Sequence, residues 1–230
     1  MIIDCVSDLH GHYPKLQGGD LLIIAGDLTD GEQEVDYLKF YSWLHKQNYT
    51  KFIVIAGNHD NSIEREETII KFLDQTVYLQ DEGTEFGGLK IWGSPWTQTF
   101  EDMNPRCKAF TMDTEEELAE KWKLIPDDVD ILITHSPPYG IRDEIHSTQQ
   151  CASMHVGSTS LFERIVEIQE KGEKKERLLI CGHIHEGCGQ QDLYRRGSTE
   201  IGWSIINASH VNEYYEPVNK PFRVTKGEIR

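Results

Sequence analysis

The fold that this chain can adopt is constrained most by short apolar segments that have the composition of β-strands. Seven of them occur, at residues 2–6, 21–25, 52–56, 89–93, 131–134, 178–181 and 204–207. Several are apolar along their whole length, which is typical of strands covered on both faces. A chain with this pattern must therefore supply covering layers on both sides of its sheets.

Helical patterns alternate with these strands. Residues 62–73 begin with Ser62, a suitable N-cap. Alternating strands and helices predict an α/β fold. The chain has no internal repeat, low-complexity tract or linker, so we expect a single domain over residues 1–230. Residues 32–48 place four apolar side chains near one face of a helix: Val35, Leu38, Tyr41 and Leu44.

Two further helices are indicated by their capping residues. Thr114 and Glu117 have the spacing of a capping box, in which each side chain satisfies a backbone N–H of the other residue. Ser158 or Ser160 is a suitable N-cap for a later helix, and Gly172 marks its end. Both helices lie between strand-like segments and extend the alternating pattern.

The chain is acidic, because 39 Asp and Glu residues against 23 Lys and Arg residues give a formal charge of −16. Proteins that grip a long nucleic acid usually present a basic surface that displaces counterions from the phosphates. This chain repels a polyanion over most of its surface, so we expect no long nucleic acid as a partner. A small phosphate-containing substrate stays compatible, because bound metal ions reverse the charge locally.

No segment indicates a membrane or an export route. No apolar run approaches the roughly 20 residues needed to span a bilayer, and the N-terminus lacks the regions of a secretory signal. The five cysteines are odd in number and form no Cys-x-x-Cys pair, which favours free thiols in a reducing compartment. We therefore expect a cytoplasmic location. The sequence does not indicate an oligomeric state.

Polar side chains follow five of the strand-like segments where each segment ends. They are Asp8 and His10, then Asp27, then Asn58 with His59 and Asp60, then His135, and finally His183 with His185. Open α/β sheets bind ligands beyond the carboxyl ends of their strands. A single Asp-x-His pattern is weak evidence, because a lone histidine beside a strand is usually structural. Five clusters in register with five strand ends indicate a shared site.

These residue types suit a pair of divalent metal ions. Carboxylate and imidazole ligands bind Mn²⁺, Fe²⁺, Zn²⁺, Co²⁺ and Ni²⁺. Two such ions about 3.5–4 Å apart acidify a water and neutralise phosphate oxygens, as hydrolysis of a phosphoester requires. Tight turns that pass close to the ions are expected at four glycines: Gly11, Gly26, Gly57 and Gly182.

Together these clusters resemble the calcineurin-like metallophosphoesterase superfamily. The resemblance extends over roughly residues 4–209, with all five motif blocks intact and in order. It implies an α/β fold made of a β-sandwich of two mixed sheets flanked by helices. The blocks are Asp8-x-His10, Gly26-Asp27, Gly57-Asn58-His59-Asp60, Thr134-His135 and Gly182-His183-x-His185.

The resemblance also implies a role for each residue. His59 would protonate the leaving oxygen or steady the phosphate, and Asp60 would orient its imidazole. Asn58 and His59 would both contact the substrate, and Asp27 is grouped with His59 and Asp60 as catalytic. The metal ligands would divide into Asp8, His10 and His185 for one ion, Asn58, His135 and His183 for the other, and Asp27 as the bridge.

The segments between the blocks resemble a smaller group, the fetal-brain-type metallophosphoesterase-domain proteins near the class III cyclic nucleotide phosphodiesterases. Some members of that group lack the first histidine of the last block, whereas this chain keeps His183. An intact second metal site is therefore expected. The segments include Gly93-Ser94-Pro95-Trp96, His135-Ser136-Pro137-Pro138 and Ile206-Asn207-Ala208-Ser209.

Three residues outside the clusters are candidates for substrate contact, each with an alternative. His155 lies just before a predicted helix start, where backbone amides can bind an anion; otherwise it is structural. Arg142 either binds phosphate or pairs with an acid such as Asp143. Trp96, with Phe100, either stacks on a nucleobase or packs in the core or a lid.

The leading hypothesis is a phosphodiesterase that acts on a small phosphodiester such as a cyclic nucleotide, through a metal-bridging hydroxide. Mn²⁺ or Fe²⁺ is the preferred ion, with Zn²⁺, Ni²⁺ and Co²⁺ as other choices. One alternative is a phosphomonoesterase or a nuclease-like enzyme. Another is a metal-bound interaction scaffold that has lost catalysis.

Overall fold

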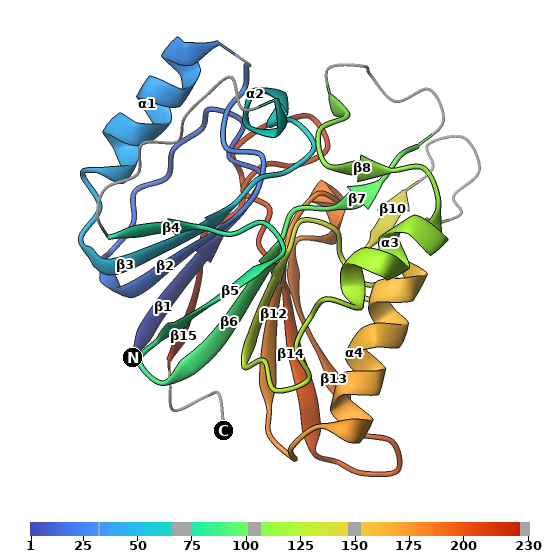
Figure 1. Ribbon diagram of the computed structural model, residues 1–230. Coiled ribbons are helices and arrows are strands. Elements are labelled where there is room, and N and C mark those ends of the chain that lie inside the picture. The colour runs from blue at the N-terminus through green and yellow to red at the C-terminus, as the bar shows by residue number, and fades with distance from the viewer. Residues whose placement is uncertain (32, 66–74, 101–106, 147–152, 226–230) are drawn as a thin grey trace.

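Two mixed β-sheets pack face to face in the computed structural model, which describes residues 1–31, 33–65, 75–100, 107–146 and 153–225 (Figure 1). The first sheet has the strand order β15 (Phe222–Thr225), β1 (Ile2–Val6), β2 (Gly19–Ala25), β3 (Tyr49–Ile55) and β4 (Thr76–Tyr78). The second has the order β13 (Gly189–Tyr194), β14 (Ile201–Asn207), β12 (Arg177–Cys181), β9 (Ile131–Thr134), β6 (Leu89–Ser94) and β5 (Glu82–Phe86).

Helices cover the outer faces of both sheets (Figure 1). The helical elements are α1 (Glu34–Leu44), α2 (Asn61–Glu64), α3 (Glu115–Trp122), α4 (Thr159–Lys171) and the 3₁₀ turn η2 (His185–Gly187). Two small strand pairs complete the described fold: β7 (Thr97–Gln98) with β8 (Thr111–Met112), and β10 (Glu144–His146) with β11 (Ser153–His155). The predicted fold class, two mixed sheets flanked by helices, is confirmed.

Alternation along the central strands explains why they are apolar throughout. Odd-numbered side chains of the first sheet, such as Ile23 and Ile53, pack against the second sheet. Even-numbered ones, such as Ile24 and Val54, pack under α1. The second sheet repeats this arrangement, with one face inward and the other under α3 and α4. Each strand therefore contributes to two apolar layers, which the side-chain period of two allows.

The buried face of α1 differs from the predicted one. The helix buries Tyr37, Phe40 and Trp43, together with Leu44. Val35 and Leu38 were expected on that face but are 49% and 56% exposed. The aromatic side chains define the packed surface here, because they cover more apolar area than the aliphatic ones.

The capping predictions have mixed outcomes. Thr114 and Glu117 form the predicted capping box at the start of α3, and Ser158 rather than Ser160 caps α4. Ser62 does not cap a helix, because α2 begins one residue earlier, at Asn61, after Asp60. Residues 66–73 of the helix predicted over residues 62–73 lie outside the described residues.

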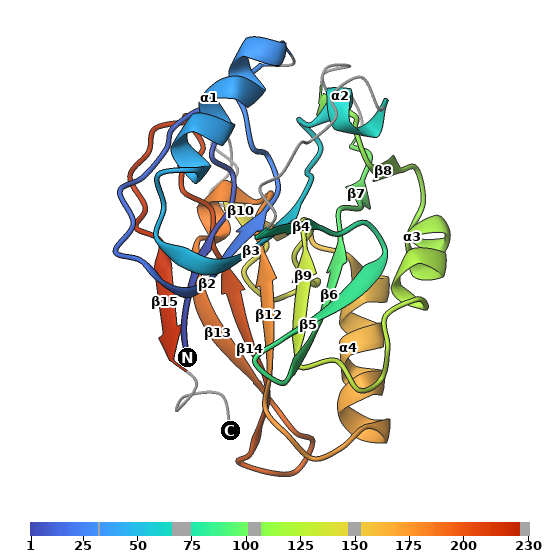
Figure 2. The same cartoon turned by 60° about the vertical axis from the view of Figure 1, so that its left-hand side comes forward.

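The carboxyl ends of the parallel strands meet at one end of the sandwich. Strands β1, β2 and β3 run parallel to one another, as do β9, β12 and β14. The turned view shows β9 and β12 rising toward the same end of the molecule as β2 and β3 (Figure 2). Within the described ranges, no helix is both long and apolar enough to cross a bilayer.

Candidate metal centre

The predicted ligands lie on the loops that leave β1, β2, β3, β9 and β12. Four of them have left-handed backbone conformations, with φ values of 51° at Asp8, 41° at His10, 54° at Asp27 and 66° at His183. Such conformations cost roughly 1–3 kcal/mol each for residues other than glycine, and they concentrate at functional sites. The surrounding fold therefore holds these side chains in place against a local conformational cost.

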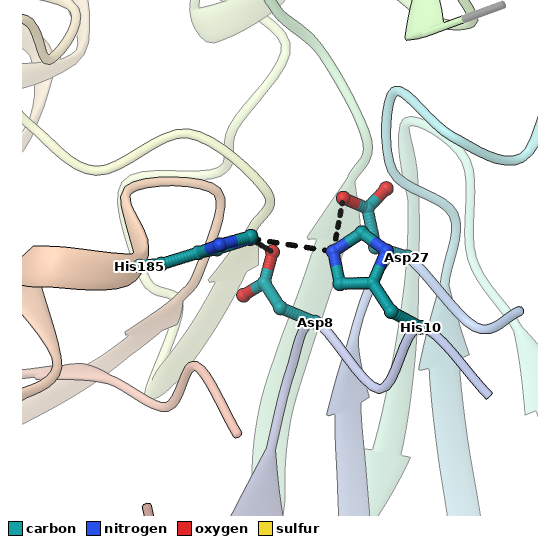
Figure 3. A group of neighbouring side chains, drawn as sticks. All are labelled: Asp8, His10, Asp27 and His185. Carbon is teal, nitrogen blue, oxygen red and sulfur yellow. Dashed lines mark hydrogen bonds and ion pairs between the residues drawn. The ribbon is translucent and has the colours of Figure 1, made fainter. Parts of the chain in front are cut away.

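One group of ligands consists of Asp8, His10, Asp27 and His185, whose ligand atoms all lie within 4.8 Å of one another (Figure 3). The Nε2 atoms of His10 and His185 are 3.3 Å apart. His185 Nε2 is 3.4 Å from Asp8 Oδ1, and His10 Nε2 is 3.5 Å from Asp27 Oδ2. The three side chains predicted for the first ion are thus brought together with the predicted bridge.

A second group surrounds the amide oxygen of Asn58. Asn58 Oδ1 lies 3.0 Å from His135 Nε2 and 2.9 Å from His183 Nδ1. The amide nitrogen of Asn58 donates to the Cys107 carbonyl at 3.0 Å, so the oxygen must face the two imidazoles. These are the three residues predicted for the second ion.

Asp27 joins the two groups through a single oxygen. Its Oδ2 lies 3.5 Å from His10 Nε2 in the first group and 3.4 Å from His135 Nε2 in the second. Its other oxygen, Oδ1, accepts the backbone N–H of His59 at 2.9 Å. The arrangement fits the predicted bridging role, with one carboxylate oxygen facing both groups and the other fixed by the backbone.

The hydrogen bonds of the imidazoles show that acceptor atoms face one another. His135 Nδ1 lies 2.8 Å from the Ala25 carbonyl, and His185 Nδ1 lies 3.1 Å from the Asn212 carbonyl. A carbonyl only accepts, so these nitrogens carry the proton and the Nε2 atoms of the neutral rings carry a lone pair. His135 Nε2 therefore presents a lone pair to the Asn58 and Asp27 oxygens. Such contacts are stable only with a second proton or a metal cation between the atoms.

The distances themselves fit metal ions. Two ligand atoms that each lie about 2.1 Å from one ion, at roughly 90–110° to each other, are about 3.0–3.4 Å apart. The contacts within each group, from 2.9 to 3.5 Å, match that spacing. His183 Nε2 is buried without a hydrogen-bond partner in the described part of the chain, and the Phe100 ring stacks on this imidazole. The donor set of carboxylate, amide and imidazole groups therefore suits two borderline divalent ions.

The pKa values of the candidate ligands show their protonation states when only protons balance the charge of the carboxylates. Burial lowers the pKa of His10 to about 4 and that of His183 to about 3, so both rings stay neutral. Burial would also lower the pKa of His135, but the Asp27 carboxylate raises it to about 9. Burial opposes ionisation of Asp8, yet the hydrogen bond and charge of His185 hold the Asp8 pKa well below its usual range. Burial likewise opposes ionisation of Asp27, but the charge of His135 holds the Asp27 pKa well below its usual range. Asp8 and Asp27 are thus both ionised at neutral pH.

Residues behind the ligands fix the Asp8 carboxylate. It accepts the backbone N–H of His183 at 3.0 Å and the Ser209 hydroxyl at 2.7 Å. The Ser209 hydroxyl also lies 2.7 Å from Asn207 Oδ1. Sequence reasoning noted Asn207 and Ser209 only as part of a resembling segment. Their role depends on β14 pairing beside β12, which no local pattern reveals.

Two of the predicted glycines lie where the chain has no room for a side chain. A Cβ at Gly57 would collide with Asp27 Oδ1, and one at Gly182 would collide with the Asp8 carboxylate. Each glycine therefore lets one loop touch a ligand that belongs to another strand.

The structure corrects the role expected of Asp60. Its carboxylate accepts the backbone N–H groups of Gly57 at 2.8 Å, Asp27 at 3.0 Å and Leu28 at 3.2 Å. Among the described residues, no hydrogen bond joins this carboxylate to the imidazole of His59, whose Nδ1 instead lies 3.6 Å from Cys107 Sγ. Asp60 thus connects the loops after β2 and β3, and its hydrogen bonds go to backbone amides instead of His59.

An open cavity of about 330 Å³ adjoins the ligands. It is lined by Asp27, Asn58, His59, Cys107, Ile145, His183, Ile184, His185, Glu186, Glu213 and Tyr215. Asn58 and His59 thus lie where a substrate contact was predicted. Sequence reasoning missed Cys107 and Tyr215, because neither belongs to a motif and both reach the cavity through tertiary packing.

The remaining predicted substrate contacts are not brought to this cavity. His155 Nδ1 is 2.7 Å from the buried Asp143 carboxylate. Nearby, the N-terminus of α4 is already occupied by the Glu115 carboxylate, which accepts the Ser160 N–H at 2.9 Å. An anion site at this helix start would therefore have to displace Glu115.

Arg142 and Trp96 are likewise engaged elsewhere. The Arg142 guanidinium donates to the Gln190 carbonyl on β13, not to Asp143. Trp96 donates through Nε1 to Asp81 at 2.8 Å, and its ring packs edge-on against Phe110. This placement of Trp96 agrees with the alternative that it packs in the core.

Comparisons with known proteins identify the same family. The calcineurin-like phosphoesterase family model matches residues 1–187. Human metallophosphoesterase domain-containing protein 1 is 34% identical over 243 residues, covering 94% of this chain and 68% of the human protein, and the mouse protein of that name gives the same values. A solved crystal structure at 14% identity shares the fold with a TM-score of 0.63 over 100% of this chain and 96% of that chain. This chain therefore belongs to the calcineurin-like phosphoesterase family of metal-dependent phosphoesterases.

Proposed function

We propose that the chain is a phosphodiesterase that hydrolyses a small phosphodiester, with cyclic nucleotides as the first candidates. The observation that carries this choice is the charge of the cavity lining. Among the described residues that line it, none is Lys or Arg, while Glu186 and Glu213 are acidic. A phosphodiester carries one negative charge and a phosphomonoester close to two at neutral pH. A lining with no cationic side chain favours the diester.

The candidate ligands determine the net charge of the metal-loaded centre to which a substrate would bind. Asp8 and Asp27 are its only ionised members, and Asn58 and the imidazoles are neutral ligands. Two divalent ions at +4 and two carboxylates at −2 would leave a net charge of +2, reduced to +1 by a hydroxide nucleophile. A monoanionic diester balances that charge, whereas a dianion exceeds it.

The chain's own residues account for the remaining requirements of the reaction. When bound, the two ions would supply an acidified water and charge neutralisation at the phosphate. Asp8, His10 and His185 would hold one ion, Asn58, His135 and His183 the other, and Asp27 both. His59 lines the cavity, and its backbone N–H is bound to Asp27 Oδ1. Its imidazole would give a proton to the leaving oxygen.

The cellular setting follows as part of the proposal. We place the protein in the cytoplasm, since three of the described cysteines, Cys5, Cys181 and Cys188, are free thiols. Mn²⁺ or Fe²⁺ is the proposed ion pair. The acidic surface supports a small substrate rather than a long nucleic acid as the partner.

The test is hydrolysis by protein reconstituted with Mn²⁺ or Fe²⁺. We expect turnover of bis-p-nitrophenyl phosphate and of at least one 2′,3′- or 3′,5′-cyclic nucleotide, with a lower kcat/KM for p-nitrophenyl phosphate. His59→Ala should lower kcat by about 10²–10⁴-fold, and Asp27→Asn should abolish turnover together with binding of the ion pair. The exposed residues His45 and Asp30 supply matched controls, His45→Ala and Asp30→Asn, which should retain activity.

Each alternative predicts a distinct result. A monoester preference would replace the proposed substrate class by a phosphomonoesterase. Full metal occupancy without turnover of any phosphoester would identify a scaffold. Unchanged rates in both His59→Ala and Asp27→Asn would show that the assigned site is not the catalytic one.

A further inference from the structure

The loop over residues 210–219 forms one wall of the cavity, although it lies beyond the motif blocks and beyond the residues matched by the family model. It is built around Asn212, whose side-chain oxygen accepts the backbone N–H groups of Tyr214 and Glu216 at 3.0 and 2.9 Å. The Asn212 carbonyl accepts from both His185 Nδ1 and the Tyr215 N–H. The loop is thus attached directly to a metal ligand.

Tyr215 is the loop residue that reaches the site. Its ring centroid lies 4.8 Å from that of His10, 5.1 Å from His185 and 6.2 Å from His59. The residue adopts a left-handed backbone with φ of 61°, a conformation that favours glycine. An aromatic ring therefore touches two ligands and the proposed proton donor at some conformational cost.

These contacts leave part of the Tyr215 ring accessible. Tyr215 is 45% exposed and lines the cavity together with Glu213 from the same loop and Glu186 from η2. Its neighbour Tyr214 is 71% exposed and is absent from the described cavity lining. One wall of the cavity is therefore aromatic, and the carboxylates beside it disfavour a second anionic group on a ligand.

We propose that Tyr215 determines specificity by packing against a planar, uncharged ring on the organic group of the substrate, such as an aryl group or a nucleobase. Aromatic side chains recognise bases and aryl rings by their apolar faces, and this contact depends on the ring rather than on the phenol hydroxyl. The inference rests on the proposed function for the place of the phosphate, which would sit at the metal centre next to His59. The substrate class narrows accordingly, from small phosphodiesters to those that carry a planar ring.

Binding of methyl(phenyl)phosphinate and dimethylphosphinate to Mn²⁺-loaded protein tests this directly, by calorimetry. Both probes are monoanions like a phosphodiester, their phosphorus–carbon bonds resist hydrolysis, and one carries a phenyl group where the other carries a methyl group. The parent should bind methyl(phenyl)phosphinate more tightly. Tyr215→Ala and Tyr215→Leu should lose about tenfold in affinity for methyl(phenyl)phosphinate and change little toward dimethylphosphinate. Tyr215→Phe and the neighbouring control Tyr214→Ala should match the parent.

Metal content, measured on every variant, completes the test. Equal affinity of the parent for the two probes, including no measurable affinity for either, would overturn the inference. An equal loss for both probes in Tyr215→Leu would do the same, by showing that the ring only supports the metal centre. A parent that discriminates between the probes through Tyr215 but hydrolyses no phosphodiester would refute the proposed function and leave this inference standing.

Discussion

The Asp60 carboxylate shows how one buried residue holds two loops of the site in register. It is fully buried and accepts three backbone N–H groups, two from the loop after β2 and one from the loop after β3. The Asp27 N–H is one of the three, so the bridging ligand is fixed through its own backbone. Asp60 therefore acts on the geometry of the candidate metal centre through backbone hydrogen bonds.

Replacing Asp60 by alanine should destabilise the whole protein. Three buried N–H donors would lose their partner, and each unsatisfied donor costs about 1–3 kcal/mol before the structure relaxes. We expect a loss of about 3 kcal/mol or more in the free energy of unfolding, measured by chemical denaturation. The exposed Asp30→Ala variant is the matched control and should lose less than about 0.5 kcal/mol.

A different result would restore the role that the motif suggested for Asp60. If Asp60→Ala keeps its stability and metal content but loses turnover, the carboxylate orients His59 after all. Sequence position alone did not separate these roles. Adjacency in a motif indicates that two residues are close, whereas the partner of a carboxylate depends on where neighbouring backbone amides point.

Among the elements, α3 and α4 are joined by a shared capping network. The Ser158 hydroxyl accepts the Leu161 N–H at 3.1 Å as the N-cap of α4, and it also accepts Trp122 Nε1 of α3 at 3.0 Å. Thr114, the N-cap of α3, is solvent-exposed and satisfies only its own helix. Loss of the Ser158 hydroxyl would leave a donor of another helix, Trp122 Nε1, without its acceptor, whereas loss of the Thr114 hydroxyl would affect α3 alone.

Ser158→Ala should therefore be more destabilising than Thr114→Ala. Loss of an exposed cap costs about 1 kcal/mol. Loss of Ser158 also leaves the buried indole N–H without its partner, which adds about 1–2 kcal/mol. Urea denaturation of both variants checks this difference, and equal costs would show that the Trp122 contact contributes nothing.

Element types were predicted where local pattern and tertiary burial agree. All seven predicted strands occur as β1, β2, β3, β6, β9, β12 and β14, because their apolar composition reflects burial on both faces. Strands such as β5 and β13 gave no such signal, since their sequences EGTEF and GQQDLY are mostly polar. They form by pairing at the edges of the second sheet. The buried face of α1 differs from the predicted one because its aromatic side chains pack against the sheet, whereas Val35 and Leu38 face solvent.

At the scale of the whole molecule, the metal centre joins the two sheets. Asp8, Asp27 and Asn58 follow strands of the first sheet, whereas His135 and His183 follow strands of the second. The convergence of the seven candidate ligands could be predicted from the sequence, since parallel strands bring their carboxyl ends to one edge. The cavity wall could not, because Tyr215 and Cys107 reach it only through packing between distant segments.

The most direct measurement is the rate of bis-p-nitrophenyl phosphate hydrolysis as a function of the number of Mn²⁺ ions bound per chain. We expect negligible turnover without metal, a rise that reaches its maximum at two ions per chain, and no such rise in Asp27→Asn. Full activity at one ion or none would contradict the shared two-ion centre. Two bound ions with no hydrolysis would contradict its assignment as a phosphodiesterase.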